Sequence, residues 1–223
     1  DGEKPQYDYS RSGNPTRAAL ETTLAELEGG AGAVCVGSGM AAIATVLSLY
    51  PAGSHIICSH DCYGGTERLL TWWERQGKIQ VTYADLSGPL QLALNLRPET
   101  KAVWVESPSN PQLNITDIAA VGRIAHAGGA KLIVDNTWPS PLITRPIEWG
   151  ADVVLHSVTK YLGGHSDVLG GALIFKEENN TFEKAHALAK TGGAVLDPFG
   201  AWLTMRGMRT LGPRLRQQSA TAL

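Results

Sequence analysis

The chain has 223 residues, of which 43% are hydrophobic, and a formal net charge of -2. This length fits one α/β domain or slightly more. Without an excess of basic residues, a nucleic acid is not expected as the main partner. The odd count of cysteines (Cys35, Cys58 and Cys62) suggests no disulfide framework, so we expect a reducing compartment and a cytoplasmic protein.

The two ends and one uncharged run bear on targeting. No charged and apolar leader opens the chain, so no signal peptide is visible. The first residue is Asp1 rather than Met, and we expect the natural start to be missing. Residues 29–54 carry no charge, but glycines and Pro51 interrupt them, which favours buried elements over a membrane span.

Apolar runs and capped segments alternate along the chain. Residues 1–15 show no regular period and are predicted to form an extended arm. Asn14 and Pro15 predict the cap and first position of a helix that ends before Gly29. Further helices are expected at 40–49, 64–76, 86–96, 118–126, 179–190 and 198–211, and strands at 33–36, 55–58, 79–83, 101–105, 131–134, 153–155 and 172–175.

This alternation predicts an α/β fold with a mostly parallel sheet sandwiched by helices. The segment between strands 153–155 and 172–175 is too short for a crossover helix. We therefore expect this one pair of strands to be antiparallel.

The most informative stretch follows the strand 153–155. Lys160 lies just past this strand, close to the hydroxyls of Ser157 and Thr159 and ahead of the glycine-rich segment 163–167. A lysine amine can form a Schiff base with an aldehyde cofactor, pyridoxal phosphate (PLP), whose phosphate the hydroxyls could hold. The alternative is a surface lysine in a loop.

Other strand ends offer the remaining groups that such a cofactor requires, because ligands bind at the carboxyl edge of an open α/β sheet. Gly37-Ser38-Gly39 opens a helix whose amides could bind phosphate. Asp135 could pair with a protonated ring nitrogen, and Tyr63 could stack on the ring, while Asn110 follows another strand. Taken singly, these residues could instead be turn glycines, a capping carboxylate and a packing tyrosine.

A dinucleotide-binding module is a competing interpretation. The segment 37–42 fits G-x-G-x-x-A after a strand, and Asp61 follows the next strand. This NAD(P) reading leaves Asp135 and the Lys160 cluster without a role.

Metal and hydrolase sites are not expected. His55, Cys58, His60 and Cys62 are ligand types, but alternate strand residues face opposite sides and no second C-x-x-C pair exists. No G-x-S-x-G motif occurs, so a hydrolase nucleophile elbow is not expected.

Nearly the whole chain resembles the PLP-dependent enzymes of cysteine and methionine metabolism, the transsulfuration family. The motifs that carry the resemblance are Tyr9-Ser10-Arg11, Gly13-Asn14-Pro15-Thr16, Leu27-Glu28-Gly29-Gly30, Ser38-Gly39-Met40-Ala41, Tyr63-Gly64-Gly65, Glu106-Ser107-Pro108-Ser109-Asn110-Pro111, Asp135-Asn136-Thr137, Ser157-Val158-Thr159-Lys160-Tyr161-Leu162, Gly164-His165-Ser166-Asp167 and Arg206-Gly207-Met208-Arg209-Thr210-Leu211.

The resemblance implies a role for each matching residue. Lys160 would bind the cofactor covalently and later move protons, with Tyr63 stacking on the ring and assisting. Asp135 would pair with the pyridine nitrogen, and Asn110 would approach the ring hydroxyl. The phosphate would be held by Gly39, Met40, Ser157 and Thr159. Tyr9 and Arg11 would complete the site of a neighbouring subunit in a homotetramer built from catalytic dimers.

The resemblance also implies the domain organisation and the substrate class. It predicts an arm at 1–15, the large PLP-binding domain of fold type I at 16–210, and a linker helix starting at 211–223. The smaller domain with the arginine for the substrate carboxylate is expected beyond this chain. The motifs at 60–65 and 107–111 look most like cystathionine γ-synthase, whereas 136–138 and 211–217 lean partly towards cystathionine β-lyase; γ-lyases remain a further alternative.

Overall fold

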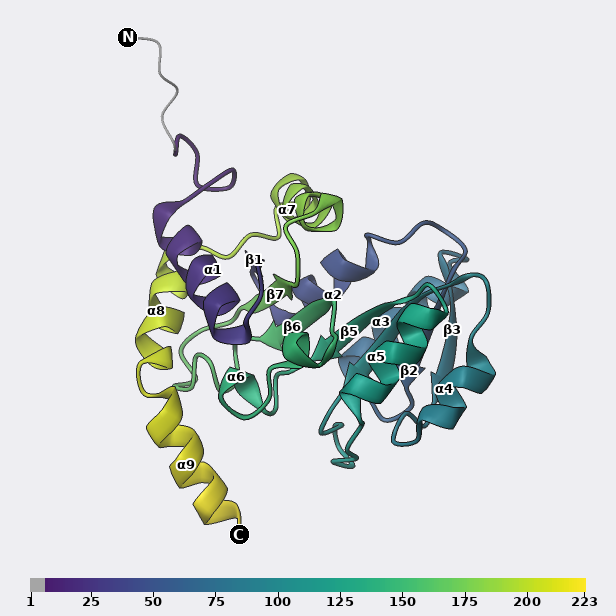
Figure 1. Ribbon diagram of the computed structural model, residues 1–223. Helices are drawn as coiled ribbons and strands as arrows, with labels where there is room; N and C mark the ends of the chain where they lie inside the picture. The colour runs from purple at the N-terminus through teal and green to yellow at the C-terminus, as the bar shows by residue number, and fades with distance from the viewer. Residues whose placement is uncertain (1–6) are drawn as a thin grey trace.

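The computed structural model describes residues 7–223 as a seven-stranded sheet with helices on both faces (Figure 1). Residues 1–6 of the predicted arm lie outside the described residues. The strands are β1 (Gly32–Val36), β2 (Ser54–Ser59), β3 (Ile79–Ala84), β4 (Thr100–Glu106), β5 (Lys131–Asp135), β6 (Val153–Ser157) and β7 (Gly171–Phe175).

The sheet order is β1-β7-β6-β5-β4-β2-β3, and it confirms the predicted fold class. Five neighbouring strands pair in parallel, in the order β6, β5, β4, β2 and β3. β7 runs antiparallel to β6, as the short segment between strands 153–155 and 172–175 led us to expect. It also runs antiparallel to β1, which was not predicted. The carboxyl ends of β4, β5 and β6 therefore meet at one edge of the sheet.

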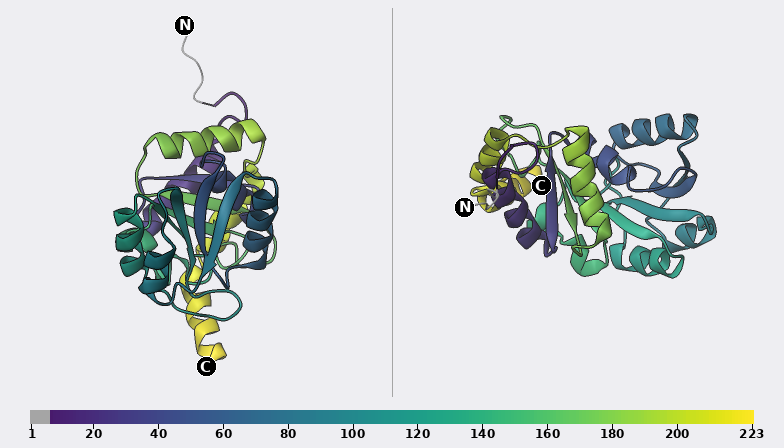
Figure 2. Two further views of the ribbon diagram at one scale, coloured as in Figure 1. Left: turned by 90° about the vertical axis from the view of Figure 1, so that its right-hand side faces the viewer. Right: turned by 90° about the horizontal axis from the view of Figure 1, so that it is seen from above.

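Helices cover the two faces in separate layers, which Figure 2 shows from two further directions. One layer, formed by α2, α3 and α7, contacts one face; α1, α4 and α5 pack on the other, with α8 against α1. The helices are α1 (Pro15–Glu28), α2 (Gly39–Leu47), α3 (Gly64–Arg75), α4 (Pro89–Asn95), α5 (Ile118–Ala127), α6 (Ser140–Ile143), α7 (Asn180–Gly192), α8 (Pro198–Met208) and α9 (Leu211–Ala222), with a 3₁₀ turn at Pro146–Trp149.

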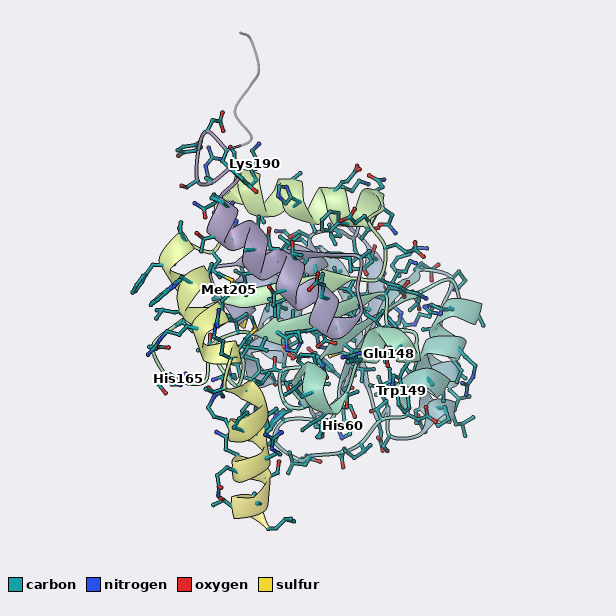
Figure 3. The ribbon with its side chains drawn as sticks, turned by 60° about the vertical axis from the view of Figure 1, so that its left-hand side comes forward. His60, Glu148, Trp149, His165, Lys190 and Met205 are labelled. Carbon is teal, nitrogen blue, oxygen red and sulfur yellow. The ribbon has the colours of Figure 1, made fainter. Side chains whose placement is uncertain are left out.

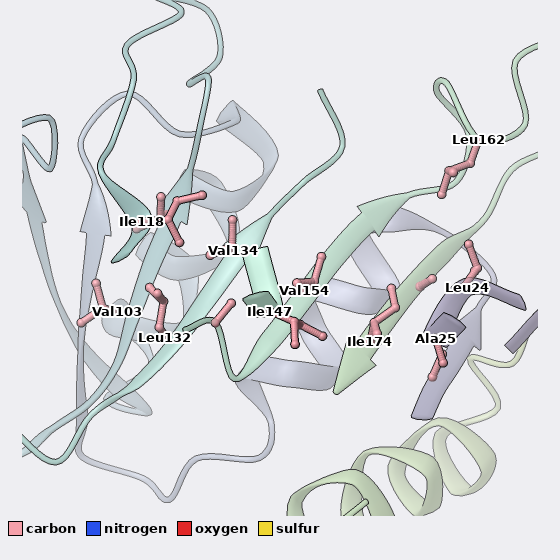
Figure 4. Close-up of a cluster of buried hydrophobic side chains, with 14 of the residues drawn as sticks. Leu24, Ala25, Val103, Ile118, Leu132, Val134, Ile147, Val154, Leu162 and Ile174 are labelled. Carbon is pink, nitrogen blue, oxygen red and sulfur yellow. The ribbon is translucent and has the colours of Figure 1, made fainter. Parts of the chain in front are cut away.

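Each face of the sheet has its own hydrophobic core. In the core of Figure 4, Leu24 of α1 packs in one buried cluster with Val134, Val154 and Ile174 from three neighbouring strands. The opposite core is built around Trp104 and the α2 side chains. The strands are thus buried on both faces, which is why they are continuously apolar in sequence.

Two predicted helices differ from the observed ones. The expected helix 198–211 is divided at residues 209–210 into α8 and α9, and the Thr210 hydroxyl donates to the Gly207 carbonyl oxygen at this corner (3.1 Å). The expected helix 86–96 begins only at Pro89, because the Asp85 side chain accepts the Ser87 N–H in a local turn (3.0 Å). The short elements α6 and Pro146–Trp149 have no clear sequence period.

The described part of the arm, residues 7–14, contains no helix or strand. Asn14 caps α1 and Pro15 is its first residue, as predicted. The buried Arg17 guanidinium donates to the carbonyl oxygens of Ser10 (2.9 Å) and Leu196 (3.1 Å). Arg11 donates to the carbonyl oxygen of Lys190 (2.9 Å), which Figure 3 labels beside the arm.

Candidate active site

A pocket of about 770 Å³ opens at the carboxyl edge of β4, β5 and β6. Eight of the ten site residues predicted from the sequence line it: Gly39, Met40, Tyr63, Asn110, Asp135, Ser157, Thr159 and Lys160. They come from five separate segments of the chain. The fold therefore brings these residues together, while their roles towards a cofactor stay predictions.

Lys160 projects from the turn that follows β6. Its backbone N–H donates to the Ser157 carbonyl (3.2 Å), and its own carbonyl accepts the N–H of Gly164 (2.8 Å). The side chain is exposed to the pocket, and among residues 7–223 no acidic side chain forms an ion pair with it. The amine is therefore available to a ligand.

The start of α2 and the end of β6 form a cradle for an anion. Ser38 caps α2 by accepting the Ala41 N–H (3.0 Å), which leaves the N–H groups of Gly39 and Met40 without an intrahelical acceptor. An added Cβ on Gly39 would lie only 3.0 Å from the Ser157 Cβ. The close approach of Gly39 therefore places helix amides beside the Ser157 hydroxyl, a combination suited to phosphate.

Thr159 lies on the same turn but is already engaged. Its hydroxyl bonds both the N–H and the carbonyl oxygen of Gly170, each at 3.2 Å. These bonds hold the turn against the segment that leads into β7.

Two carboxyl groups lie side by side at the base of the pocket. Asp135 ends β5, is 5% exposed and accepts the Thr137 N–H at 3.1 Å. Its neighbour in register is Glu106 at the end of β4. Burial raises the pKa of Asp135, and burial together with the Asp135 charge raises the pKa of Glu106 to about 9. A cationic ligand group would relieve this accumulation of acid.

Tyr63 and Asn110 come from the loops after β2 and β4. Tyr63 is the N-cap residue of α3, and its backbone N–H donates to the Glu106 carboxyl group (2.6 Å). The Tyr63 ring and the Met40 thioether both lie against Gly65. Tyr63 and Asn110 both line the pocket, on the side of β2 and β4.

Tyr9 and Arg11 do not line this pocket. Tyr9 is exposed, and the Arg11 guanidinium lies 5.2 Å from the centre of its ring. Tyr9 and Arg11 thus lie outside the pocket of their own chain, and their role in a neighbouring subunit stays a prediction.

The sheet topology contradicts the dinucleotide-binding alternative. In that arrangement the first two strands of the motif lie together in the sheet. Here four strands separate β1 from β2. Asp61 is buried, accepts hydrogen bonds from Ser109 and from Asn114 (2.9 Å), and so serves the loop after β4.

His55, one of the side chains that suggested metal ligands by type, has other partners. The two ring nitrogens of His55 bond the Thr100 (2.8 Å) and Thr82 (2.9 Å) hydroxyls. Within residues 7–223, no three His, Cys, Asp or Glu side chains are grouped to hold a metal ion. In the same span, no helix has the length and apolar character needed to cross a bilayer.

Several pocket residues were not among the predicted site residues. Glu106 follows the same strand-end rule that indicated Asp135 and could have been found by it. Thr137, Trp138 and Tyr161 adjoin predicted residues in sequence, whereas Arg214 and Gln218 of α9 carry no local signal and are brought to the pocket by tertiary packing.

Comparison with known proteins assigns the fold and the site to a family. The sequence model described as "Cys/Met metabolism PLP-dependent enzyme" matches residues 1–223. The chain belongs to this family. Its cofactor is pyridoxal phosphate, and its fold is the large domain of fold type I. The resemblance stated from the motifs is confirmed.

Individual relatives carry different activities. The chain is 44% identical over 222 residues to a probable cystathionine gamma-synthase of Herpetosiphon aurantiacus, covering 100% of this chain and 69% of the relative. It is 48% identical over 221 residues to a cystathionine beta-lyase of Lactococcus lactis subsp. cremoris (99% and 58%). A crystal structure of cystathionine gamma synthase from Xanthomonas oryzae pv. oryzae, with aminoacrylate and cysteine, has a TM-score of 0.94 at 46% identity (99% and 58%). The chain thus spans 58% to 69% of these proteins.

The pocket has the chemical groups that pyridoxal phosphate requires. Among residues 7–223, no lysine or arginine forms an ion pair with the buried Asp135, which suits the positively charged nitrogen of the ring. The Gly39 cradle suits the phosphate, and an added Cβ there would fill it. The unpaired Lys160 amine suits the aldehyde. The residues present therefore fit the cofactor of the family.

Proposed function

We propose that the protein catalyses cleavage or exchange of a bond at the β or γ carbon of a sulfur-containing amino acid, with Lys160 as the catalytic base. The observation that carries this proposal is the shared pocket of Lys160, Asp135 and the Gly39 cradle. When bound, pyridoxal phosphate supplies a conjugated ring that accepts the electron pair left on the substrate carbon.

Each residue has a distinct proposed task. The Lys160 amine would be the attachment point for the cofactor and, when free, would take the proton from the α carbon of the substrate. Asp135 keeps the ring nitrogen protonated by pairing with it in a buried site. Gly39, Met40 and Ser157 would bind the phosphate, and Thr159 would join them by turning its hydroxyl proton away from the Gly170 carbonyl oxygen. Tyr63 and Asn110 would orient the ring.

We further propose that the reaction is that of a cystathionine γ-synthase, in which an activated homoserine and cysteine form cystathionine. The motifs at 60–65 and 107–111 support this choice, together with the similarity to the Xanthomonas oryzae synthase. The proposed substrate is a small amino acid. The specificity of the enzyme therefore depends on the few side chains that line the pocket together with Lys160, among them Trp138 and Tyr161.

Cystathionine β-lyase activity is the second candidate. It is favoured by the 48% identity to the Lactococcus lactis lyase and by the segment 211–217. Both proposed reactions begin with removal of the α proton by Lys160. The β-lyase then breaks the bond between the β carbon and sulfur, whereas the synthase releases the leaving group from the γ carbon and forms a new bond there to the cysteine sulfur.

The test is an assay of the purified full-length protein with three substrate sets: O-succinylhomoserine plus cysteine, cystathionine alone, and methionine alone. Cystathionine formed from the first set supports the synthase, and pyruvate and homocysteine formed from the second support the β-lyase. A protein that carries the cofactor but converts none of the three contradicts the proposal. Lys160→Ala is the control, because it removes the base.

A further inference from the structure

Helix α9 contributes a polar face to the pocket. Leu211 and Leu215 of this helix are buried in the core that also contains Leu20 and Leu24. Arg214 and Gln218 lie three and seven residues after Leu211, so they share its helix face, and both line the pocket. The buried leucines therefore fix the place from which Arg214 reaches the site.

The Arg214 guanidinium joins two segments of the chain. One nitrogen donates to the carbonyl oxygen of Tyr161, the residue directly after Lys160, at 2.9 Å. The other two donate to the Gly207 carbonyl oxygen (2.9 Å) and the Thr210 hydroxyl (3.0 Å) at the corner between α8 and α9. A planar guanidinium with three such acceptors has a single orientation.

The turn after Lys160 is shaped to receive this guanidinium. Gly164 has φ +73, and a Cβ at this position would collide with the Arg214 guanidinium. The carbonyl oxygen of Lys160 accepts the N–H of this same glycine (2.8 Å). The backbone that follows Lys160 is thus held by one arginine, at Tyr161 and beside Gly164, and the position of this arginine is set by α9.

On the basis of the role proposed for Lys160, we infer that Arg214 is a positioning residue: it braces the turn 161–164 and so sets the place of the Lys160 amine in the pocket. An amine held in place reacts with the cofactor aldehyde faster than one on a mobile turn, because misplacement by about 1 Å can lower a rate by about 10²-fold. Helix α9 then belongs to the active site.

The test measures how fast the full-length apoprotein captures pyridoxal phosphate, from the rise of its visible absorbance and circular dichroism. We expect Arg214→Leu and Arg214→Lys to capture the cofactor at least about tenfold more slowly than the parent. Gly164→Ala should act similarly, because it displaces the guanidinium without removing its charge. Arg216→Leu, an exposed arginine of the same helix, should capture at the parental rate.

Gly129→Ala is the control for backbone strain, since Gly129 has φ +75 but no atom within 4 Å of an added Cβ. The thermal midpoint of each apoprotein is measured in parallel. If the Arg214 variants lose thermal stability but capture the cofactor at the parental rate, the inference is overturned and the arginine is only structural. If the parent itself captures no cofactor through Lys160, the proposed function fails instead, and this outcome is visible before any variant is compared.

Discussion

The pocket contains a buried acidic residue, Asp135, and an exposed basic residue, Lys160. Asp135 is 5% exposed and lies beside Glu106, and the two acids together make the base of the pocket favourable for a cation. Lys160, on the turn after β6, is exposed and lines the same pocket. In the proposed function, the protonated ring nitrogen and the aldehyde would therefore be bound by different residues of the same edge.

Substitution of Asp135 by Asn tests the acid. A neutral amide cannot compensate the charge of the ring nitrogen, and hydrogen bonds to charged groups contribute about 1.5–3 kcal/mol, so we expect about 10- to 100-fold weaker cofactor binding. The measurement is titration of the apoprotein with pyridoxal phosphate. Unchanged affinity in a folded Asp135→Asn variant would show that this carboxylate does not pair with the cofactor.

The strand-end rule accounts for how much of the site could be predicted. Asp135, Ser157 and Lys160 follow apolar strands, and the parallel sheet brings such positions to one edge, so their proximity followed from the strand pattern alone. Arg214 could not be found in this way, because it lies on a helix and does not follow a strand. This helix is held at the pocket by Leu211, which is 51 residues after Lys160 and is buried in the core. Residues brought by helix packing carry no periodic signal of their destination.

At the scale of single elements, the start of α2 depends on how closely it approaches β6. An Ala at position 39 would force apart Gly39 and Ser157, whose Cβ lies 3.0 Å from the added methyl. We expect Gly39→Ala to weaken binding of pyridoxal phosphate by about tenfold while leaving binding of pyridoxal, which has no phosphate, nearly unchanged.

Gly192→Ala is the matched control, since this glycine also lies in a helix and nothing lies within 4 Å of its added Cβ. Both ligands should bind this variant as they bind the parent. An equal loss of pyridoxal and its phosphate in Gly39→Ala would mean that the cradle does not hold the phosphate.

Helix α1 carries a titratable group against the edge strand β1. Glu21 accepts the Cys35 N–H (2.9 Å), and burial raises the pKa of Glu21 from 4.5 to about 7, although this hydrogen bond and Arg17 act in the opposite direction. Between these two pH values the unfolded chain releases the proton and the folded chain keeps it. Raising the pH through this window therefore lowers the free energy of unfolding.

Glu21→Gln removes this dependence and can still accept the Cys35 N–H. Between pH 4.5 and 7, the variant should gain about 3 kcal/mol in free energy of unfolding relative to the parent. Urea unfolding of both proteins across this range measures the difference, and Glu26→Gln, an exposed position of the same helix, is the control. Parallel pH curves for parent and Glu21→Gln would contradict the raised pKa.

At the scale of the whole molecule, residues 7–14 of the arm do not line the pocket of their own chain. Arg17 fastens it to the body through the Ser10 carbonyl, and exposed Tyr9 lies beside Arg11. This placement, together with the family resemblance, supports the proposal that Tyr9 and Arg11 bind the phosphate in a neighbouring subunit of a homo-oligomer.

Complementation between two inactive variants tests this sharing. Arg11→Ala and Lys160→Ala should each be inactive alone, but co-expression should restore about one quarter of the parental activity, since half of the two-fold symmetric pairs then contain one intact site. The measurement is turnover of the purified mixture. If no activity returns although mixed oligomers form, Arg11 acts within its own subunit or has no catalytic task.

The central claim is that Lys160 holds the cofactor at the sheet edge formed by β4, β5 and β6. The most direct measurement is reduction of the cofactor-loaded full-length protein with borohydride, followed by mass spectrometry of its peptides. We predict a single phosphopyridoxyl modification on Lys160, and none in Lys160→Ala. A modification on a different lysine, or the same labelling in the Lys160→Ala variant, would contradict the account.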